Sequence, residues 1–325
     1  TITPAPPPEA VGDQKTLVLL VDFQDSGPRR LTKEQANDFI FNPNSQFQKF
    51  YKENSYGQVS FSGDVKGWYK LNREGKPYYN ATGDCTNKVY IDSTEIQDFI
   101  SRDSINLGNY NRIIFLGDLI GNCSYVGKLQ FVIDGHNYKL SQAWVYPNDN
   151  LILGNYDYVL AHEVGHSLGV YHANSLECGE DISYGHCTHD EYGNPFDVMG
   201  NGTKSYNFNA FYKKIFGWIN QNSTLVIDHS GRFTLNPLED GLGNGKKLGL
   251  IKLSDSSIPF SLEYRNSLGS NSGLFINKLD IAKPEGYKGT RLLDMTPSSN
   301  NSGFLGRDDF FDSSLKSTFR DNGLN

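Results

Sequence analysis

Residues 161–173, AHEVGHSLGVYHA, hold three of the seven histidines of the chain within a short segment. His162 and His166 are four residues apart, so on a helix they lie on the same face, about one turn from each other. Two imidazoles in this arrangement can bind one zinc ion through bonds of about 2.0–2.1 Å. Glu163 would point to the side of this pair, off the metal yet close enough to hold a water molecule there. Histidines on an ordinary surface do not need this spacing.

His172 joins the other two histidines only if the helix ends soon after His166. On a continuous helix, His172 would lie about 9 Å further along the axis and would be rotated away. Gly169 is the residue type that ends a helix in the left-handed conformation at little cost. The pattern HExxHxxGxxH therefore predicts three metal ligands, one base and the turn that brings in the third ligand.

The segment from about Asp157 to Leu168 is predicted to be this helix, with Asp157 as its N-cap. Leu160, Val164 and Leu168 recur every four residues and can therefore face a core. The metal-binding face and the buried face are thus separate faces of one helix.

Strand and helix patterns alternate before this helix and give way to short strands after it. Apolar or alternating runs predict strands at 15–25, at 58–71 with a bend at Gly63, at 111–118, and at 128–147, where a turn at Asp134–Gly135 divides two strands. Helices are predicted after the capping-box residues Thr32 and Gln35, over 45–57 and over about 91–101. Short strand-like runs follow at 231–238, 246–255, 260–267 and 273–280.

These patterns predict an α+β fold in three parts. The proline-rich residues 1–14 form an arm or linker. Residues 15–227 form the domain that contains a mixed sheet and the histidine-bearing helix. Residues 228–325 form a strand-rich subdomain, which we expect to pack on the first domain.

The composition disfavours several classes of partner. The net charge is −7 and no block of Lys and Arg is present, which disfavours nucleic acid and anionic membrane as main partners. No run approaches the roughly 18–20 apolar residues that a membrane-spanning helix needs. The sequence leaves the oligomeric state open, and we expect a monomer.

The four cysteines fit two disulfides in a secreted protein. We expect Cys178 to pair with Cys187, because these two are close together in the sequence, and Cys85 to pair with Cys123. Four cysteines permit two other pairings, and four reduced thiols in a core are a further alternative.

A methionine supports the interpretation of the histidines. The turn-rich stretch YGNPFDVMG, residues 192–200, places one of only two methionines, Met199, after His172. The long histidine motif followed by a methionine turn is the pattern of metzincin metalloproteases. The chain resembles the gametolysin-like peptidases in particular, through KTLVLLVDFQD, FYKENSYGQVSFSGDVKGWY, FNAFYKKIFGWI, FSLEYRNS and RLLDMTPSS, which span about residues 15–297.

The resemblance implies a secreted zinc-dependent endopeptidase that cleaves extracellular proteins through a zinc-bound water. It assigns one Zn²⁺ per chain to His162, His166 and His172, the general base to Glu163, and the floor beneath the metal to Met199. It also implies an upper subdomain with a twisted mixed sheet and the active-site helix, and a smaller part after Gly169. Extended polypeptide substrate would pair with an edge strand within 138–146. Calcium is left open, since no EF-hand-like loop is present.

Two positions depart from related enzymes. Some gametolysin-type enzymes carry Gln at the first ligand position, whereas His162 gives the ordinary site of three histidines. Astacin- and serralysin-type metzincins carry a tyrosine two residues after the methionine that can bind zinc. That position is Asn201 here, which leaves Tyr206 as a more distant candidate for stabilising the oxyanion.

Other functions are alternatives to a zinc endopeptidase. One is a binding or adhesion module that keeps a metalloprotease fold, although the intact Glu163 and complete ligand set count against it. Another is an aminopeptidase or a different zinc hydrolase, in which a distant glutamate is usually the third ligand. His186 and His189, beside Cys187, belong either to a second metal site or to a solvated loop.

Overall fold

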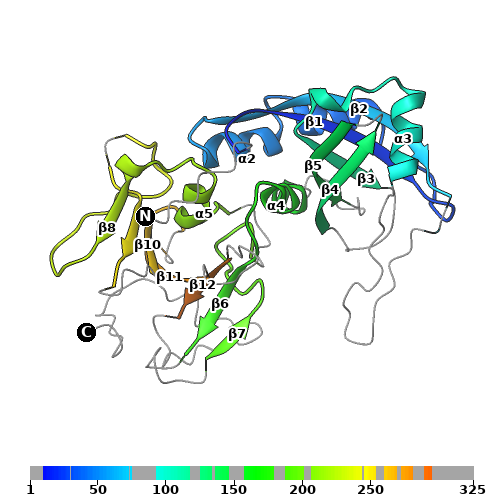
Figure 1. Ribbon diagram of the computed structural model, residues 1–325. Coiled ribbons are helices and arrows are strands. Elements are labelled where there is room, and N and C mark those ends of the chain that lie inside the picture. Colours follow the sequence, from blue (N-terminus) through cyan, green and yellow to red (C-terminus); the bar gives the residue numbers. More distant parts are fainter. Residues whose placement is uncertain are drawn as a thin grey trace. The chain divides into compact units, whose positions relative to one another are not determined.

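The computed structural model (Figure 1) describes residues 10–29, 31–72, 74, 93–117, 125–133, 136–145, 157–178, 187–200, 206–243, 245–253, 260–268, 272–280 and 289–294. The chain divides into two compact units. The N-terminal unit comprises Pro8–Lys52 and Gly57–Leu168, and the C-terminal unit includes Glu53–Tyr56 and Gly169–Asn325. Helices and strands occur in both units, as the prediction of an α+β fold requires.

The N-terminal unit contains a five-stranded mixed sheet with the order β2-β1-β3-β5-β4. Its strands are β1 (Gly12–Asp22), β2 (Val59–Lys70), β3 (Arg112–Gly117), β4 (Tyr125–Ile133) and β5 (His136–Val145). The four strands β2, β1, β3 and β5 are parallel, and β4 is antiparallel to β5. The predicted strands over 15–25, 58–71, 111–118 and 128–147 are therefore confirmed within a few residues.

The apolar run of β1 is buried on both faces of the sheet. Leu17, Leu19 and Val21 belong to a core cluster that also includes residues of helix α3 (Ser93–Arg102), such as Phe99. Side chains of successive strand residues alternate between faces, so Val18 and Leu20, also fully buried, point to the opposite side. This double burial is typical of strands in parallel sheets.

The helices of this unit begin where the sequence indicates. Helix α1 (Lys33–Phe41) has the predicted capping box, because Thr32 accepts from the N–H of Gln35 and the Gln35 side chain accepts from the N–H of Thr32. Helix α2 (Gln46–Asn54) ends three residues before the predicted end at Gly57. Helix α3 and a short 3-10 helix, η1 (Leu107–Asn109), precede β3.

Strand β2 corrects the prediction of a bend at Gly63. The pairing of β2 with β1 continues through Gly63, and its irregularity lies between Leu20 and Val21. Gly63 instead allows the two strands to approach closely, since a Cβ atom there would lie 1.8 Å from the carbonyl oxygen of Thr16. The glycine therefore serves strand packing.

The predicted edge strand is also wrong. Strand β5, which covers 138–145, pairs with β3 on one side and with β4 on the other. In the described part of the sheet, the outer strands are β2 and β4. The hairpin formed by β4 and β5 folds back beyond the parallel strands, so its first strand takes the edge.

The C-terminal unit contains a seven-stranded sheet with the order β7-β6-β12-β11-β10-β9-β8. The strands are β6 (Ala173–Glu177), β7 (Thr188–Asp190), β8 (Thr224–Ile227), β9 (Leu248–Ile251), β10 (Phe260–Arg265), β11 (Gly273–Asp280) and β12 (Gly289–Leu293). Helix α5 (Ala210–Ile215) contacts β10, and a 3-10 helix, η2 (Gln221–Ser223), precedes β8. Strands from residues 228–325 therefore share one sheet with β6, β7 and β8.

One predicted strand in this region is absent. Residues 231–238 contain no strand, and only an isolated bridge joins Pro237 to Tyr264. Pro237 has no N–H to donate, and Phe233 lies at the surface. The alternation in this segment therefore does not correspond to a buried face. The other three runs contain β9, β10 and β11.

Candidate metal centre

Helix α4 (Asp157–Ser167) carries the first two histidines and follows the predicted range closely. Asp157 is the first residue of the helix. The prediction made Asp157 the N-cap, so the helix begins one residue earlier than predicted. Leu160, Val164 and Leu168 are almost completely buried, as their spacing predicts. On the same helix, the rings of His162 and His166 lie 4.7 Å apart between centroids and are nearly perpendicular. The helix contacts β4 and β5 of its own unit.

The chain leaves helix α4 through Gly169, whose φ is 107°. The N–H of Leu168 still bonds to the carbonyl of Val164, so the helical pattern ends immediately before the glycine. A residue with a side chain rarely adopts this backbone conformation. The chain thus turns after Leu168 and reaches His172 without a further helical turn.

The three histidines of the motif come together. One ring nitrogen from each of His162, His166 and His172 can be chosen so that all three atoms lie within 4.8 Å of one another. Among the residues that the structure describes, this is the one group of three or more His, Cys, Asp or Glu side chains able to hold a metal ion. Imidazole nitrogen suits zinc, copper, iron and nickel. The donor set therefore fits a transition-metal ion.

Glu163 follows the first histidine on helix α4, and only 5% of its surface is exposed. A carboxylate with so little contact with water has a stronger local electrostatic effect than one at the surface. Its position next to His162 in the sequence is the one that the motif assigns to a base.

Two buried side chains that the sequence analysis missed hold helix α4 in place. The hydroxyl of Tyr51 donates to the carbonyl of Ala161 at 2.7 Å, and burial raises the pKa of Tyr51 well above its ordinary value. The guanidinium of Arg112 donates to Ser167 Oγ and, at 2.5 Å, to Gln14 Oε1. A cation near the last turn of a helix also interacts favourably with the helix dipole.

The third histidine has neighbours of its own in the C-terminal unit. The Nδ1 atom of His172 lies 2.6 Å from Oε1 of Glu191, and the Tyr192 ring packs against the imidazole with centroids 3.7 Å apart. The carbonyl of His172 accepts a hydrogen bond of 2.8 Å from the hydroxyl of Tyr212. Both the ring and the backbone of His172 are therefore held.

The turn that contains Met199 is bonded to the strand that follows His172. The N–H of Ala173 donates to the carbonyl of Met199 at 2.8 Å, and the N–H of Asn194 donates to the carbonyl of Ala173 at 3.1 Å. The Met199 side chain is completely buried. The backbone of the turn therefore fixes the first residue of β6, immediately after the third histidine.

A buried carboxylate stabilises this turn. Asp197 accepts hydrogen bonds from the N–H of Met199 at 2.7 Å and from the backbone and side chain of Asn209 at 2.7 and 2.8 Å. Burial raises the pKa of Asp197 to about 6. A buried ion pair between Glu263 and Arg265 lies in the same network, because Arg265 donates to the carbonyl of Phe196.

Lys213 on helix α5 is buried and interacts electrostatically with Asp197, Glu263 and Arg265 of this network. Its burial is expected to make the folding stability depend on pH. Burial lowers the pKa of its ammonium group from 10.5 to about 7, and the nitrogen lies 4.6 Å from the centre of the Tyr56 ring. Between these pH values the unfolded chain binds more protons than the folded chain, so this group makes stability rise with pH. We expect Lys213→Met to reduce that rise by about 1 kcal/mol or more, since one pKa unit corresponds to about 1.4 kcal/mol. Urea unfolding of both proteins at several pH values within that window measures the difference. The prediction would be contradicted if the free energy of unfolding rose equally with pH in both proteins.

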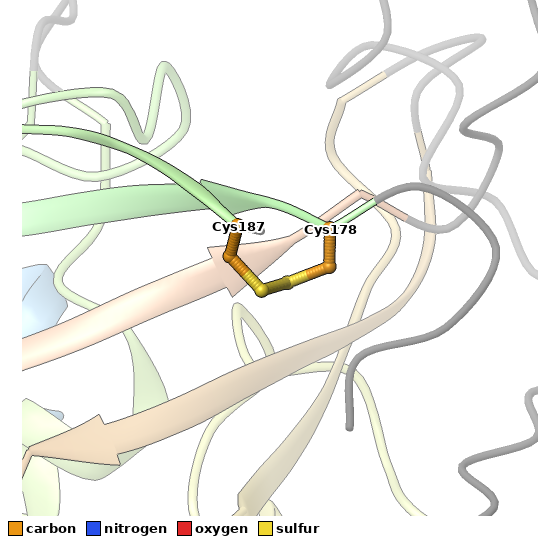
Figure 2. The surroundings of a disulfide bond; sticks show 2 residues. All are labelled: Cys178 and Cys187. Carbon is orange, nitrogen blue, oxygen red and sulfur yellow. A yellow bond between two sulfur atoms is a disulfide. The ribbon is translucent and has the colours of Figure 1, made fainter. Parts of the chain in front are cut away.

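The predicted disulfide between Cys178 and Cys187 is present (Figure 2). It joins the end of β6 to the beginning of β7, two strands that are already antiparallel neighbours. Cys85, Cys123, Asn201 and His186 lie outside the described residues. The second disulfide therefore stays a prediction, and for His186 and His189 we expect a solvated loop in preference to a second metal site. His189 lies exposed on β7, and the Tyr206 ring packs edge-on against Phe196.

No family model matches the chain, and a comparison with curated proteins finds no match. In the described parts of the chain, no helix is long and apolar enough to cross a membrane.

Proposed function

We propose that this chain is a zinc-dependent endopeptidase of the metzincin type. The proposal rests on the convergence of His162, His166 and His172. One ring nitrogen of each histidine lies within 4.8 Å of those of the other two. Three neutral imidazoles are the protein ligands of catalytic zinc sites that leave a further position for water or substrate. The burial of Glu163 beside the first ligand supports its assignment as the base.

When bound, zinc would acidify a water molecule and polarise the carbonyl of the scissile peptide bond. The residues of this chain would bind the ion, transfer the protons and hold the helix. The three histidines hold the ion, and Glu163 takes a proton from the attacking water and returns it to the leaving amine. Tyr51 and Arg112 keep the histidine-bearing helix in place on the sheet.

The substrate that we propose is an extended polypeptide of an extracellular protein. Strand β4 is an outer strand of the described sheet, so Tyr125–Ile133 offers backbone groups with which such a peptide can pair. The disulfide between Cys178 and Cys187 supports secretion, since disulfides form and persist in oxidising compartments.

Casein zymography tests this proposal. We expect the purified chain to clear casein, 1,10-phenanthroline to abolish the clearing, and added zinc to restore it. The physical reason is that a chelator removes the ion without changing a covalent bond of the protein. Clearing that persists in excess chelator would refute the metal-dependent mechanism. Zinc binding with no clearing of any protein substrate would favour a binding or adhesion module instead.

A further inference from the structure

His172 is contacted by two neighbouring residues of one short turn, Glu191 and Tyr192. Oε1 of Glu191 lies 2.6 Å from Nδ1 of His172, and the Tyr192 ring lies against the imidazole at an interplanar angle of 33°. The first contact is to the edge of the imidazole ring and the second is to its face. Together they restrict both rotation of the ring and the position of its proton.

The backbone of this turn is fixed in a conformation that is uncommon for its residues. Tyr192 has a φ of 64°, in the left-handed region that bulky residues rarely adopt. Its N–H donates to Oδ1 of Asn174, a buried residue of β6, at 3.2 Å. The N–H of Gly193 closes the turn on the carbonyl of Asp190 at 3.1 Å. Residues in such conformations cluster at functional sites, where the surrounding structure holds them.

The contact with Glu191 determines which nitrogen of His172 is available. An ionised carboxylate only accepts hydrogen bonds, so the proton of the neutral imidazole lies on Nδ1. Nε2 then carries the lone pair that can bind a metal ion. In known metal sites a histidine ligand usually donates its other N–H to a carboxylate, carbonyl or water, and this partner orients the ring and raises its basicity.

We propose that Glu191 is a positioning residue for the third metal ligand, fixing the proton of His172 on Nδ1 while Tyr192 fixes the plane of the ring. This inference rests on the metal site proposed above and adds a residue that the histidine motif does not contain. The Glu191 side chain is 61% exposed. Exposed pairs contribute little to folding stability. If the pair had only a structural role, removing Glu191 would therefore change neither the folding stability nor the affinity for metal.

The chain offers a matched control. Asp228 Oδ1 lies 2.8 Å from Nδ1 of His229, and both side chains are mostly exposed. This pair has the same chemistry as Glu191 with His172, but His229 is not among the three grouped histidines. Removing each carboxylate in turn therefore separates an effect on a metal ligand from the general loss of a His–carboxylate pair.

The test measures zinc affinity of the full-length chain by competition with a chromophoric chelator, for wild type, Glu191→Ala, Glu191→Gln and Asp228→Ala. We expect Glu191→Ala to weaken zinc binding about 10- to 100-fold. Glu191→Gln should lose less zinc affinity than Glu191→Ala, because its amide oxygen still accepts a hydrogen bond. Asp228→Ala should match wild type, and all melting temperatures without metal should agree. Wild-type affinity in Glu191→Ala, or an equal loss in Asp228→Ala, would overturn the proposal.

A second measurement separates this inference from the proposed function. Long-range ¹H–¹⁵N NMR spectra of the metal-free protein, at a mildly alkaline pH where imidazole is neutral, report which nitrogen of His172 carries the proton. We expect Nδ1–H in wild type and a shift towards Nε2–H in Glu191→Ala. The same tautomer in both proteins would overturn the positioning role. A wild-type protein that binds zinc and shows this difference, yet cleaves no peptide, would instead overturn the proposed endopeptidase function alone.

Discussion

Replacing Glu163 with alanine is expected to lower the rate of peptide hydrolysis by about 100- to 10,000-fold, the typical contribution of general acid–base catalysis. The variant keeps all three histidines, so we expect its zinc content to equal that of wild type. Glu163 does not belong to the grouped metal ligands, and we expect its neighbour Val164, which is completely buried, to stay buried in the variant. The measurement is the turnover number beside zinc content and melting temperature.

Glu163→Gln is the matched control for the loss of volume at this buried position. Glutamine has nearly the shape of glutamate but cannot take a proton from water. We therefore expect Glu163→Gln to be as inactive as Glu163→Ala and to melt at a temperature closer to that of wild type. Wild-type turnover in either variant would show that Glu163 is not the base.

Replacing His172 with alanine is expected to remove zinc and activity together. Two histidines remain on helix α4, and a site with two imidazoles holds zinc more weakly than a site with three. We expect His172→Ala to lose its metal on dialysis and to be nearly inactive. Its melting temperature in the presence of zinc should fall, because a ligand at 100 times its Kd stabilises the folded state by about 2.7 kcal/mol.

His189→Ala is the control for this variant. His189 lies exposed on β7 and is not among the three grouped histidines. We expect His189→Ala to retain its zinc, activity and melting temperature. A His172→Ala variant that keeps a full equivalent of zinc through dialysis would show that His172 is not a ligand. Zinc lost equally from both variants would point to a general loss of structure.

The predictions that hold are those that depend on neighbouring residues in the sequence. Helical periodicity places His162 and His166 on one face, and the capping box of Thr32 and Gln35 forms as predicted. Strand β1 also forms within a few residues of the predicted range, over its uninterrupted apolar run. Each of these features has its physical cause within about ten residues.

The features that the sequence analysis missed depend on residues that are distant in the chain. Tyr51 supports helix α4 from 110 positions away, and Arg112 supports it from 55. Neither residue differs locally from an ordinary core tyrosine or strand arginine. Glu191 is 19 positions from His172, and its role depends on how β7 returns beside β6.

The error at the sheet edge has a similar cause. The expectation of an edge strand within 138–146 comes from the resemblance, and the residues of β5 do not by themselves say which strands lie beside it. Its interior position follows from parallel pairing with β3 and antiparallel pairing with β4. The absent strand at 231–238 shows the converse, because a suitable alternation there has no partner strand beyond one isolated bridge.

The most direct test of the proposed zinc peptidase is a titration of the metal-free chain with zinc, with cleavage of an internally quenched peptide blocked at both ends as the readout. An aminopeptidase cannot cleave this peptide, so hydrolysis reports endopeptidase activity. We predict that the rate rises in proportion to added zinc and stops rising at about one zinc ion per chain, the capacity of one site with three histidine ligands. Full cleavage before zinc is added, or a filled zinc site with no cleavage across a peptide library, would contradict the proposal.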